Sequence, residues 1–99
     1  MASVEISTVG ERGTVPLLTL IGEFDLSNFK LVDDFIILWL AQGRTEAVLD
    51  MTRTRFVDAA VLESLGKARA AGLVLTIQGA KGVVRRALEA AEMGELIAD

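Results

Sequence analysis

The side chains of this sequence that could do chemistry are mostly carboxylates. Among the 14 Asp and Glu residues are the pair Glu23 and Asp25, the adjacent Asp33 and Asp34, and the isolated Asp58. A glycosidase needs two carboxyl groups that flank its substrate, and neither pair is spaced for that arrangement. Cysteine, histidine and tyrosine are absent from the 99 residues, which excludes thiolate nucleophiles, imidazole bases and Cys/His zinc sites. We therefore predict no catalytic activity, no metal and no cofactor.

The charge and hydropathy of the chain exclude two further classes of protein. Ten Lys and Arg against 14 Asp and Glu give a formal net charge of −4, whereas binding to a phosphate backbone depends on neutralisation by Lys and Arg. The most apolar segment, residues 35–41, is far shorter than the roughly 20 residues of a membrane-spanning helix. The N-terminus lacks the basic and apolar segments of a secretory signal. We predict a cytoplasmic protein that neither binds nucleic acid nor spans a membrane.

Hydrophobic periodicity predicts a single α/β domain over residues 1–99. The predicted elements are, in order, strand 4–9, strand 14–21, helix 28–42, strand 45–51, a helix capped by Asp58 that runs to 71, strand 73–78, helix 83–92 and a last turn at 95–98. A glycine-containing turn joins the first two strands into a hairpin, and the later strand–helix–strand order predicts parallel crossovers. The expected fold is a mixed β-sheet with an N-terminal hairpin and parallel βαβ crossovers, covered by three to four α-helices.

Residues at the ends of two helices predict where those helices begin and end. Ser27 or Asn28 can accept a hydrogen bond from the free N–H groups at the start of the first helix, and Asp58 can do so at the second. Gly43 and Gly72 suit the left-handed position that follows a helix C-terminus.

The first helix carries more apolar side chains than one buried face needs. One stripe at helical spacing is predicted to face the core, and it comprises Phe29, Val32, Phe35, Ile36, Trp39 and Leu40. Leu31, Ile37 and Leu38 lie outside this stripe. Either the helix is wedged deeply under a neighbouring element, or these three residues form a second apolar face for a homodimer or a docked partner. Both interpretations fit the sequence.

Two acidic turns, residues 22–25 and 56–60, each join a strand end to a helix start. Taken singly, each turn needs no function, because acidic residues are favoured near helix N-termini. The ordered set of 22–25, 47–51, 56–62 and 83–89 resembles the STAS domain of anti-sigma factor antagonists, and the similarity runs from about residue 4 to 98. The resemblance implies a non-enzymatic protein that binds an anti-sigma factor with a kinase-type fold and thereby frees a sigma factor.

The resemblance also implies where the partner binds and how binding is regulated. The family motif reads Asp-Ser-Ser/Ala-Gly-Leu, and its first serine is phosphorylated to abolish binding. Asp58 matches the aspartate, Ala59 falls on the phosphorylated serine, Ala60 on the next small residue and Val61 on the glycine. We therefore expect a binding surface without phosphoregulation at the usual position, in which the branched Val61 takes the place of a glycine that would leave room for the partner. That surface comprises Glu23, Asp25, Asp58, Ala59, Ala60 and Val61.

Two questions stay open in the sequence. Thr52, Thr54 and Ser64 supply other hydroxyl groups that a kinase could modify. The extra apolar face of the first helix also suits a STAS subunit of a larger assembly, such as a domain docked on an ABC-type lipid transporter ATPase or part of a stress-signalling complex.

Overall fold

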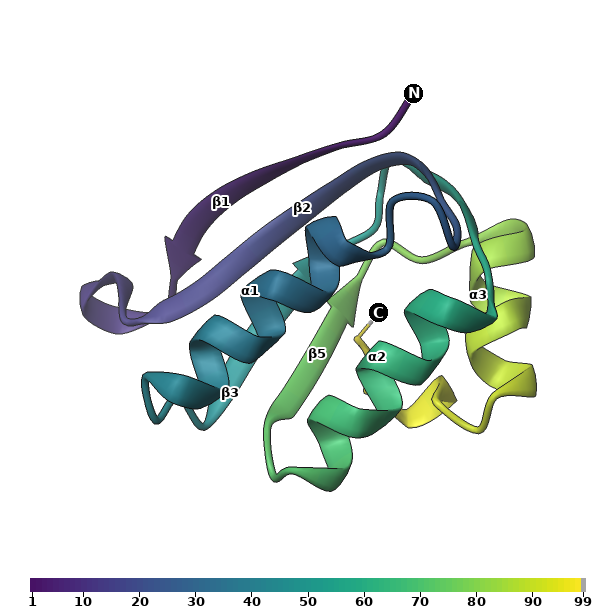
Figure 1. The fold of residues 1–99 in the computed structure, drawn as a ribbon. Coiled ribbons are helices and arrows are strands. Elements are labelled where there is room, and N and C mark those ends of the chain that lie inside the picture. The colour runs from purple at the N-terminus through teal and green to yellow at the C-terminus, as the bar shows by residue number, and fades with distance from the viewer. Residues whose placement is uncertain (99) are drawn as a thin grey trace.

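Six strands and three α-helices make up residues 1–98, the part of the chain that the computed structural model describes (Figure 1). The strands are β1 (Ser3–Val9), β2 (Val15–Phe24), β3 (Glu46–Asp50), β4 (Thr54–Val57), β5 (Val74–Gln78) and β6 (Ile97–Ala98). The helices are α1 (Lys30–Ala41), α2 (Ala59–Ala70) and α3 (Gly82–Ala90), and short 3₁₀ turns cover Glu11–Gly13 and Gly94–Leu96.

The strands form one mixed sheet, which confirms the predicted fold class. β1 and β2 are an antiparallel hairpin, whose register runs from Ser3 opposite Ile21 to Val9 opposite Val15. The other neighbours in the order β1-β2-β3-β5-β6 are parallel. Parallel neighbours need a crossover connection, and each of the three helices lies within one.

β4 is a strand that the sequence does not predict. The first half of β2 pairs with β3 through Leu17 and Val48, whereas its last residues pair with β4 from Gly22 opposite Thr54, after which the register shifts. The residues of β4 are buried, exposed, exposed and buried in turn, so the period of two that marks a half-buried strand is missing. β6 also differs from the prediction. Its two residues form a short strand, whereas the sequence predicts a last turn over 95–98.

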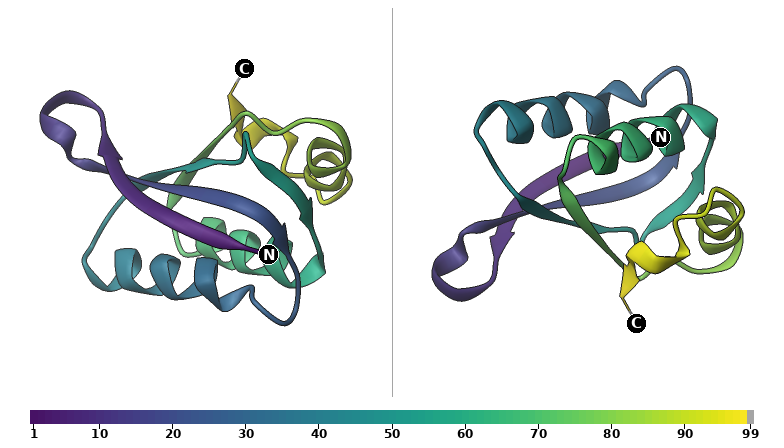
Figure 2. Two further views of the ribbon diagram at one scale, coloured as in Figure 1. Left: turned by 90° about the horizontal axis from the view of Figure 1, so that it is seen from above. Right: turned by 90° about the horizontal axis from the view of Figure 1, so that it is seen from below.

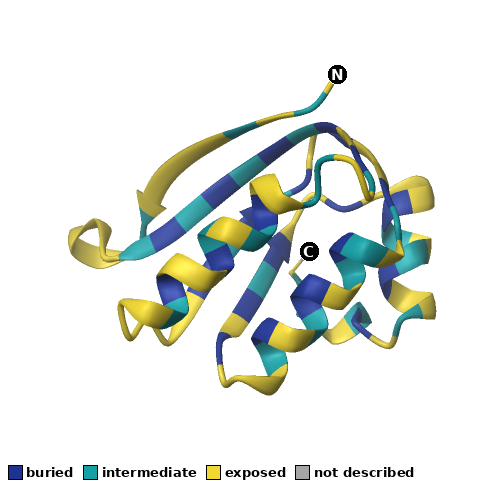
Figure 3. Ribbon diagram, viewed as in Figure 1, coloured by how far each residue is buried: buried dark blue, intermediate teal, exposed yellow. Residues whose placement is uncertain are grey.

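The core lies between the sheet and the pair of helices α1 and α2, which lie side by side on one face (Figures 1 and 2). α3 packs against β4 at the end of the sheet. Inward-facing strand residues alternate with half-buried ones along β2, as Figure 3 shows. The buried residues of these layers include Leu18, Leu20, Phe24, Leu49, Ile77, Val32, Ile36, Trp39, Val61 and Leu65.

α1 buries the stripe that the sequence predicts and leaves three large apolar residues outside it. Val32, Ile36 and Trp39 are buried, and Phe29, Phe35 and Leu40 are half-buried against the core. Leu31, Ile37 and Leu38 are 40%, 57% and 47% exposed. A helix wedged under its neighbours would hide these side chains, so that interpretation is wrong. Within residues 1–98, no helix combines the length and the apolar character needed to cross a bilayer.

Candidate partner-binding site

The loop between β2 and α1 is held by its own side chains. The Oδ1 atom of Asp25 accepts hydrogen bonds from the backbone N–H of Ser27 at 2.9 Å and from its hydroxyl at 2.5 Å. The Ser27 hydroxyl, followed by the Ser27 backbone N–H, lowers the pKa of Asp25 below its ordinary value, since both donors favour the carboxylate. Asp25 is therefore a fixed negative charge at the surface.

Asn28 folds back onto the same loop instead of capping α1. Its Oδ1 atom accepts from the N–H of Asp25 at 2.8 Å, and its amide donates to the carbonyl of Glu23 at 2.9 Å. Phe29 occupies the N-cap position and makes no side-chain cap bond. The prediction that Ser27 or Asn28 caps the helix is wrong, because both side chains are used by the loop that precedes it.

Asp58 joins this loop to the start of α2. Its Oδ1 atom accepts from the N–H of Ala60 at 2.9 Å, which confirms the predicted cap, and its Oδ2 atom accepts from the N–H of Leu26 at 3.0 Å. The Asp58 N–H donates to the carbonyl of Phe24 at 3.1 Å. Because of these bonds, residues 25–27 and Asp58 line one shallow hollow of about 460 Å³.

The three residues after Asp58 have different environments. Ala59 is the first residue of α2 and is exposed, and Ala60 is half-buried. Val61 is 0% exposed and belongs to the core. The prediction that Val61 stands at the partner surface is wrong, since its spacing from Leu65 and Ala68 places it on the buried side of α2.

A groove between α1 and α2 extends this surface, and the sequence does not predict it. It has a volume of about 270 Å³ and begins at Leu26, whose side chain is 73% exposed. An apolar residue between Asp25 and Ser27 in a polar loop is the feature of the sequence that indicates it. The groove is lined by Leu26, Phe29, Asp33, Ala60, Glu63, Ser64 and Lys67.

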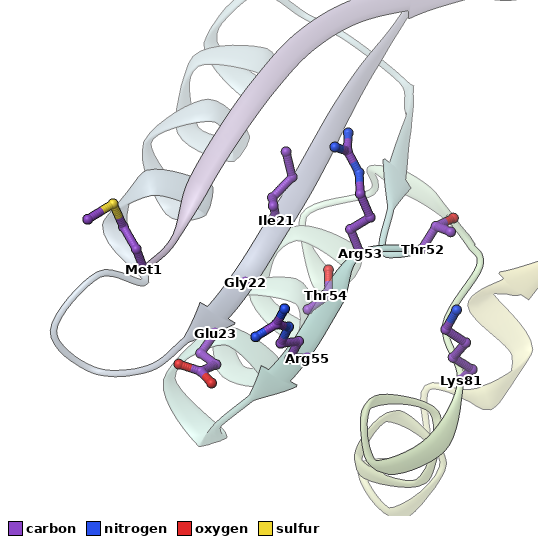
Figure 4. Close-up of a pocket in the computed structure, with 9 residues that line it drawn as sticks. All are labelled: Met1, Ile21, Gly22, Glu23, Thr52, Arg53, Thr54, Arg55 and Lys81. Carbon is purple, nitrogen blue, oxygen red and sulfur yellow. The ribbon is translucent and has the colours of Figure 1, made fainter.

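Glu23 does not join Asp25 and Asp58. It precedes the end of β2 and lines a separate cavity of about 560 Å³ together with Thr52, Arg53, Arg55 and Lys81 (Figure 4). The structure therefore divides the predicted surface into two regions. One is acidic and lies around Asp25 and Asp58, and the other is the cavity in which Glu23 lies among basic side chains.

The three hydroxyl groups considered as kinase sites also differ. Thr54 is buried and donates to the carbonyl of Leu20 at 2.7 Å, and Ser64 is buried in α2. Thr52 is exposed, and its hydroxyl donates to Asp50 at 2.6 Å. Only Thr52 of these three is accessible in this conformation.

The fold and the acidic junction between β2, β4 and α2 define a STAS-type domain. The family model described as Mlab, STAS domain, matches residues 7–98. The chain belongs to this family.

Two solved structures share the fold of this chain, and one curated protein is similar to it in sequence. The structure of the anti-sigma factor antagonist SpoIIAA in its unphosphorylated form has a TM-score of 0.79 at 19% identity and covers 98% of this chain and 87% of that chain. An anti-sigma factor antagonist from Mycobacterium paratuberculosis gives 0.71 at 17% identity, with 96% and 83% covered. The RNA polymerase sigma factor sigA of Arabidopsis thaliana is 30% identical over 91 residues, 92% of this chain. The chain spans 18% of the length of that sigma factor.

Proposed function

We propose that this chain is a non-catalytic interaction module of sigma-factor control, which acts in the cytoplasm and binds an anti-sigma factor with a kinase-type fold. The observation that carries the proposal is the bond between Leu26 and Asp58, because it joins two loops into one preformed surface. The similarity to structures of anti-sigma factor antagonists supports this partner class. The absence of histidine, cysteine and tyrosine supports a role without catalysis.

The charges around this surface indicate the chemistry of the partner. Asp25, Asp33, Asp58 and Glu63 surround the exposed Leu26. The single cation in the groove, Lys67, already pairs with Glu63 at 3.4 Å. A partner that inserts between α1 and α2 should therefore present Lys or Arg side chains around a small apolar contact, since complementary charges steer association and suppress wrong partners.

The position of Ala59 indicates how binding is regulated. It is exposed at the first turn of α2, beside the carboxylate of Asp58, and it has no hydroxyl. A phosphate at this position would add about −1.5 to −2 charges beside the Asp58 carboxylate, and the like-charge repulsion would disturb the preformed junction at which the partner docks. We propose that the chain lacks this control and stays competent to bind.

A pull-down from the protein's own cells tests the proposal, with the wild type compared with Ala59→Asp. The added carboxylate should reduce capture of the partner about tenfold, because its repulsion by the neighbouring Asp58 disturbs the junction that Asp58 holds and because it must itself be desolvated on binding. Ala70→Asp is the matched control, since Ala70 is exposed at the other end of the same helix. Equal capture by wild type and Ala59→Asp would show that the partner binds elsewhere.

A second candidate function follows from the exposed apolar residues of α1. Leu31 and Leu38 lie on one side of the helix about two turns apart, and Ile37 lies about 100° around the axis from Leu38. Such a face suits a homodimer, or a STAS subunit docked in a larger assembly such as an ABC-type lipid transporter or a stress-signalling complex. The exposure of these three residues supports this alternative.

A further inference from the structure

A cavity of about 560 Å³ lies away from the acidic surface, at the carboxyl ends of two parallel strands. Thr52 and Arg53 follow β3, and Lys81 follows β5. Figure 4 shows the side chains of these residues at the cavity. In open α/β sheets, ligands bind in the crevice outside the carboxyl ends of the strands. The cavity volume of about 560 Å³ lies within the range of about 300–1,000 Å³ that is usual for small-molecule sites.

The cations of this cavity are available to a ligand. Within residues 1–98, the side chains of Arg55 and Lys81 make no hydrogen bond or ion pair. Arg53 has a loose contact with Glu5 at 3.6 Å, and both side chains are more than half exposed, so this pair contributes little. Glu23 is the one carboxylate among the lining residues. Three cations against one anion make a local positive site in a chain of net charge −4.

The backbone beside these cations favours an anion as well. Lys81 is the N-cap of α3, and this helix start has no side-chain cap bond. The first N–H groups of a helix lack acceptors within the helix and carry a partial positive charge. Gly79 has a φ of +75° and lies so close to Thr52 that a Cβ atom would collide with it. The loop that carries Lys81 is therefore held against the loop that carries Arg53.

We propose that this cavity binds the phosphate group of a small ligand. Arg53 and Arg55 supply planar donors that match phosphate oxygens, Lys81 supplies a point charge, and the start of α3 supplies backbone donors. The cavity is larger than one phosphate, so the ligand carries a further group or a second phosphate. This site is independent of the proposed partner surface, because the two share no lining residue.

Titration of the full chain with inorganic pyrophosphate, followed by two-dimensional ¹H–¹⁵N NMR at fixed ionic strength, tests the proposal. We expect saturable shifts at the N–H groups of Thr52, Arg53, Lys81 and Gly82. Titration with chloride at the same ionic strength should produce no saturable shift of these signals. Arg55→Gln and Lys81→Gln should each weaken pyrophosphate binding about tenfold, because each removes a charge-assisted contact.

Lys67→Gln is the matched control, because it removes a cation that lies in the groove between α1 and α2. Its affinity for pyrophosphate should equal that of the wild type. Both test side chains are exposed, so the variants should keep the wild-type far-UV circular dichroism. Shifts that never saturate, shifts of equal size around Lys67, or equal affinity of Arg55→Gln, Lys81→Gln and wild type would each overturn the proposal.

Discussion

Asp58 and Leu26 are 32 positions apart in the sequence, yet the Asp58 carboxylate accepts the Leu26 N–H at 3.0 Å while its other oxygen caps α2. Asp58→Ala removes both bonds and should lower the free energy of unfolding by about 1–2 kcal/mol. Asp58→Asn keeps one acceptor oxygen and should lose about half as much. Urea unfolding measures both changes, and Asp34→Ala, at an exposed position of α1, is the control. Equal stability of Asp58→Ala and wild type would show that the junction is held by other contacts.

The Asp25 carboxylate gives the folded protein a pH dependence with a defined sign. Its pKa is lower in the folded state than in an unfolded chain, chiefly because of the Ser27 hydroxyl. The unfolded state therefore binds a proton more readily, so this contribution to stability is present above the ordinary pKa and is lost as the pH falls through about 4 and below. Carbon-13 NMR titration of the Asp25 carboxyl measures the shift.

Ser27→Ala is the sharper form of that test. It removes the hydroxyl and retains the backbone donor, so the pKa of Asp25 should rise part of the way to its ordinary value. A pKa unaffected by this substitution would assign the shift to the backbone alone.

The end of α3 differs from the ends of the other two helices. α1 and α2 are followed by Gly43 and Gly72 with φ of +73° and +95°, whereas Glu92 has φ of +61° in the corresponding position. The N–H of Met93 donates to the carbonyl of Leu88 at 2.9 Å, as in a glycine-terminated helix. Because glycine adopts this conformation without steric cost, Glu92→Gly should raise the free energy of unfolding by about 0.5–1 kcal/mol. Gly72→Ala should lower it in the same urea experiment, and the opposite pair of signs would contradict this account.

The exposed face of α1 can be tested by charge insertion. If it is a homodimer contact, Leu31→Glu with Leu38→Glu should shift the mass measured by analytical ultracentrifugation from dimer to monomer while circular dichroism stays unchanged. Val74→Glu is the control, since Val74 is a large exposed apolar residue of β5. Ile37→Glu, on a different side of the helix, shows which flank is used. A wild type that is monomeric at all concentrations would exclude the homodimer and leave a docked partner as the role of this face.

The sequence predicts the parts of this fold that follow a period and misses those that do not. Hairpin, helices and parallel strands each have a regular apolar pattern, and the cap at Asp58 needs only its neighbours. β4 has no such pattern. It pairs with the last residues of β2, which exchanges β3 for β4 as its neighbour at Gly22.

The site shows a second limit of the sequence. Glu23 and Asp25 are two residues apart and would share a face if β2 continued. β2 ends at Phe24, however, and the loop that follows carries Asp25 to a different cavity. The motif alignment places Val61 at a glycine position, but only the packing of α2 shows that its side chain enters the core.

The burial of Val61 changes how the missing phosphorylation site should be restored. Val61→Gly would empty a core position and place glycine in a helix, at a cost of about 3 kcal/mol, and it would not open the surface. Ala59→Ser alone is the appropriate variant, since a serine at the exposed first turn of α2 costs only a few tenths of a kcal/mol. A purified kinase of the anti-sigma factor class should transfer phosphate to this variant and not to the wild type, as measured by mass spectrometry. Ala70→Ser, on the same helix, is the control for non-specific transfer. Phosphate on wild-type Thr52 would show that an exposed threonine has taken over the regulation. It would contradict the proposal that the chain always stays competent to bind its partner.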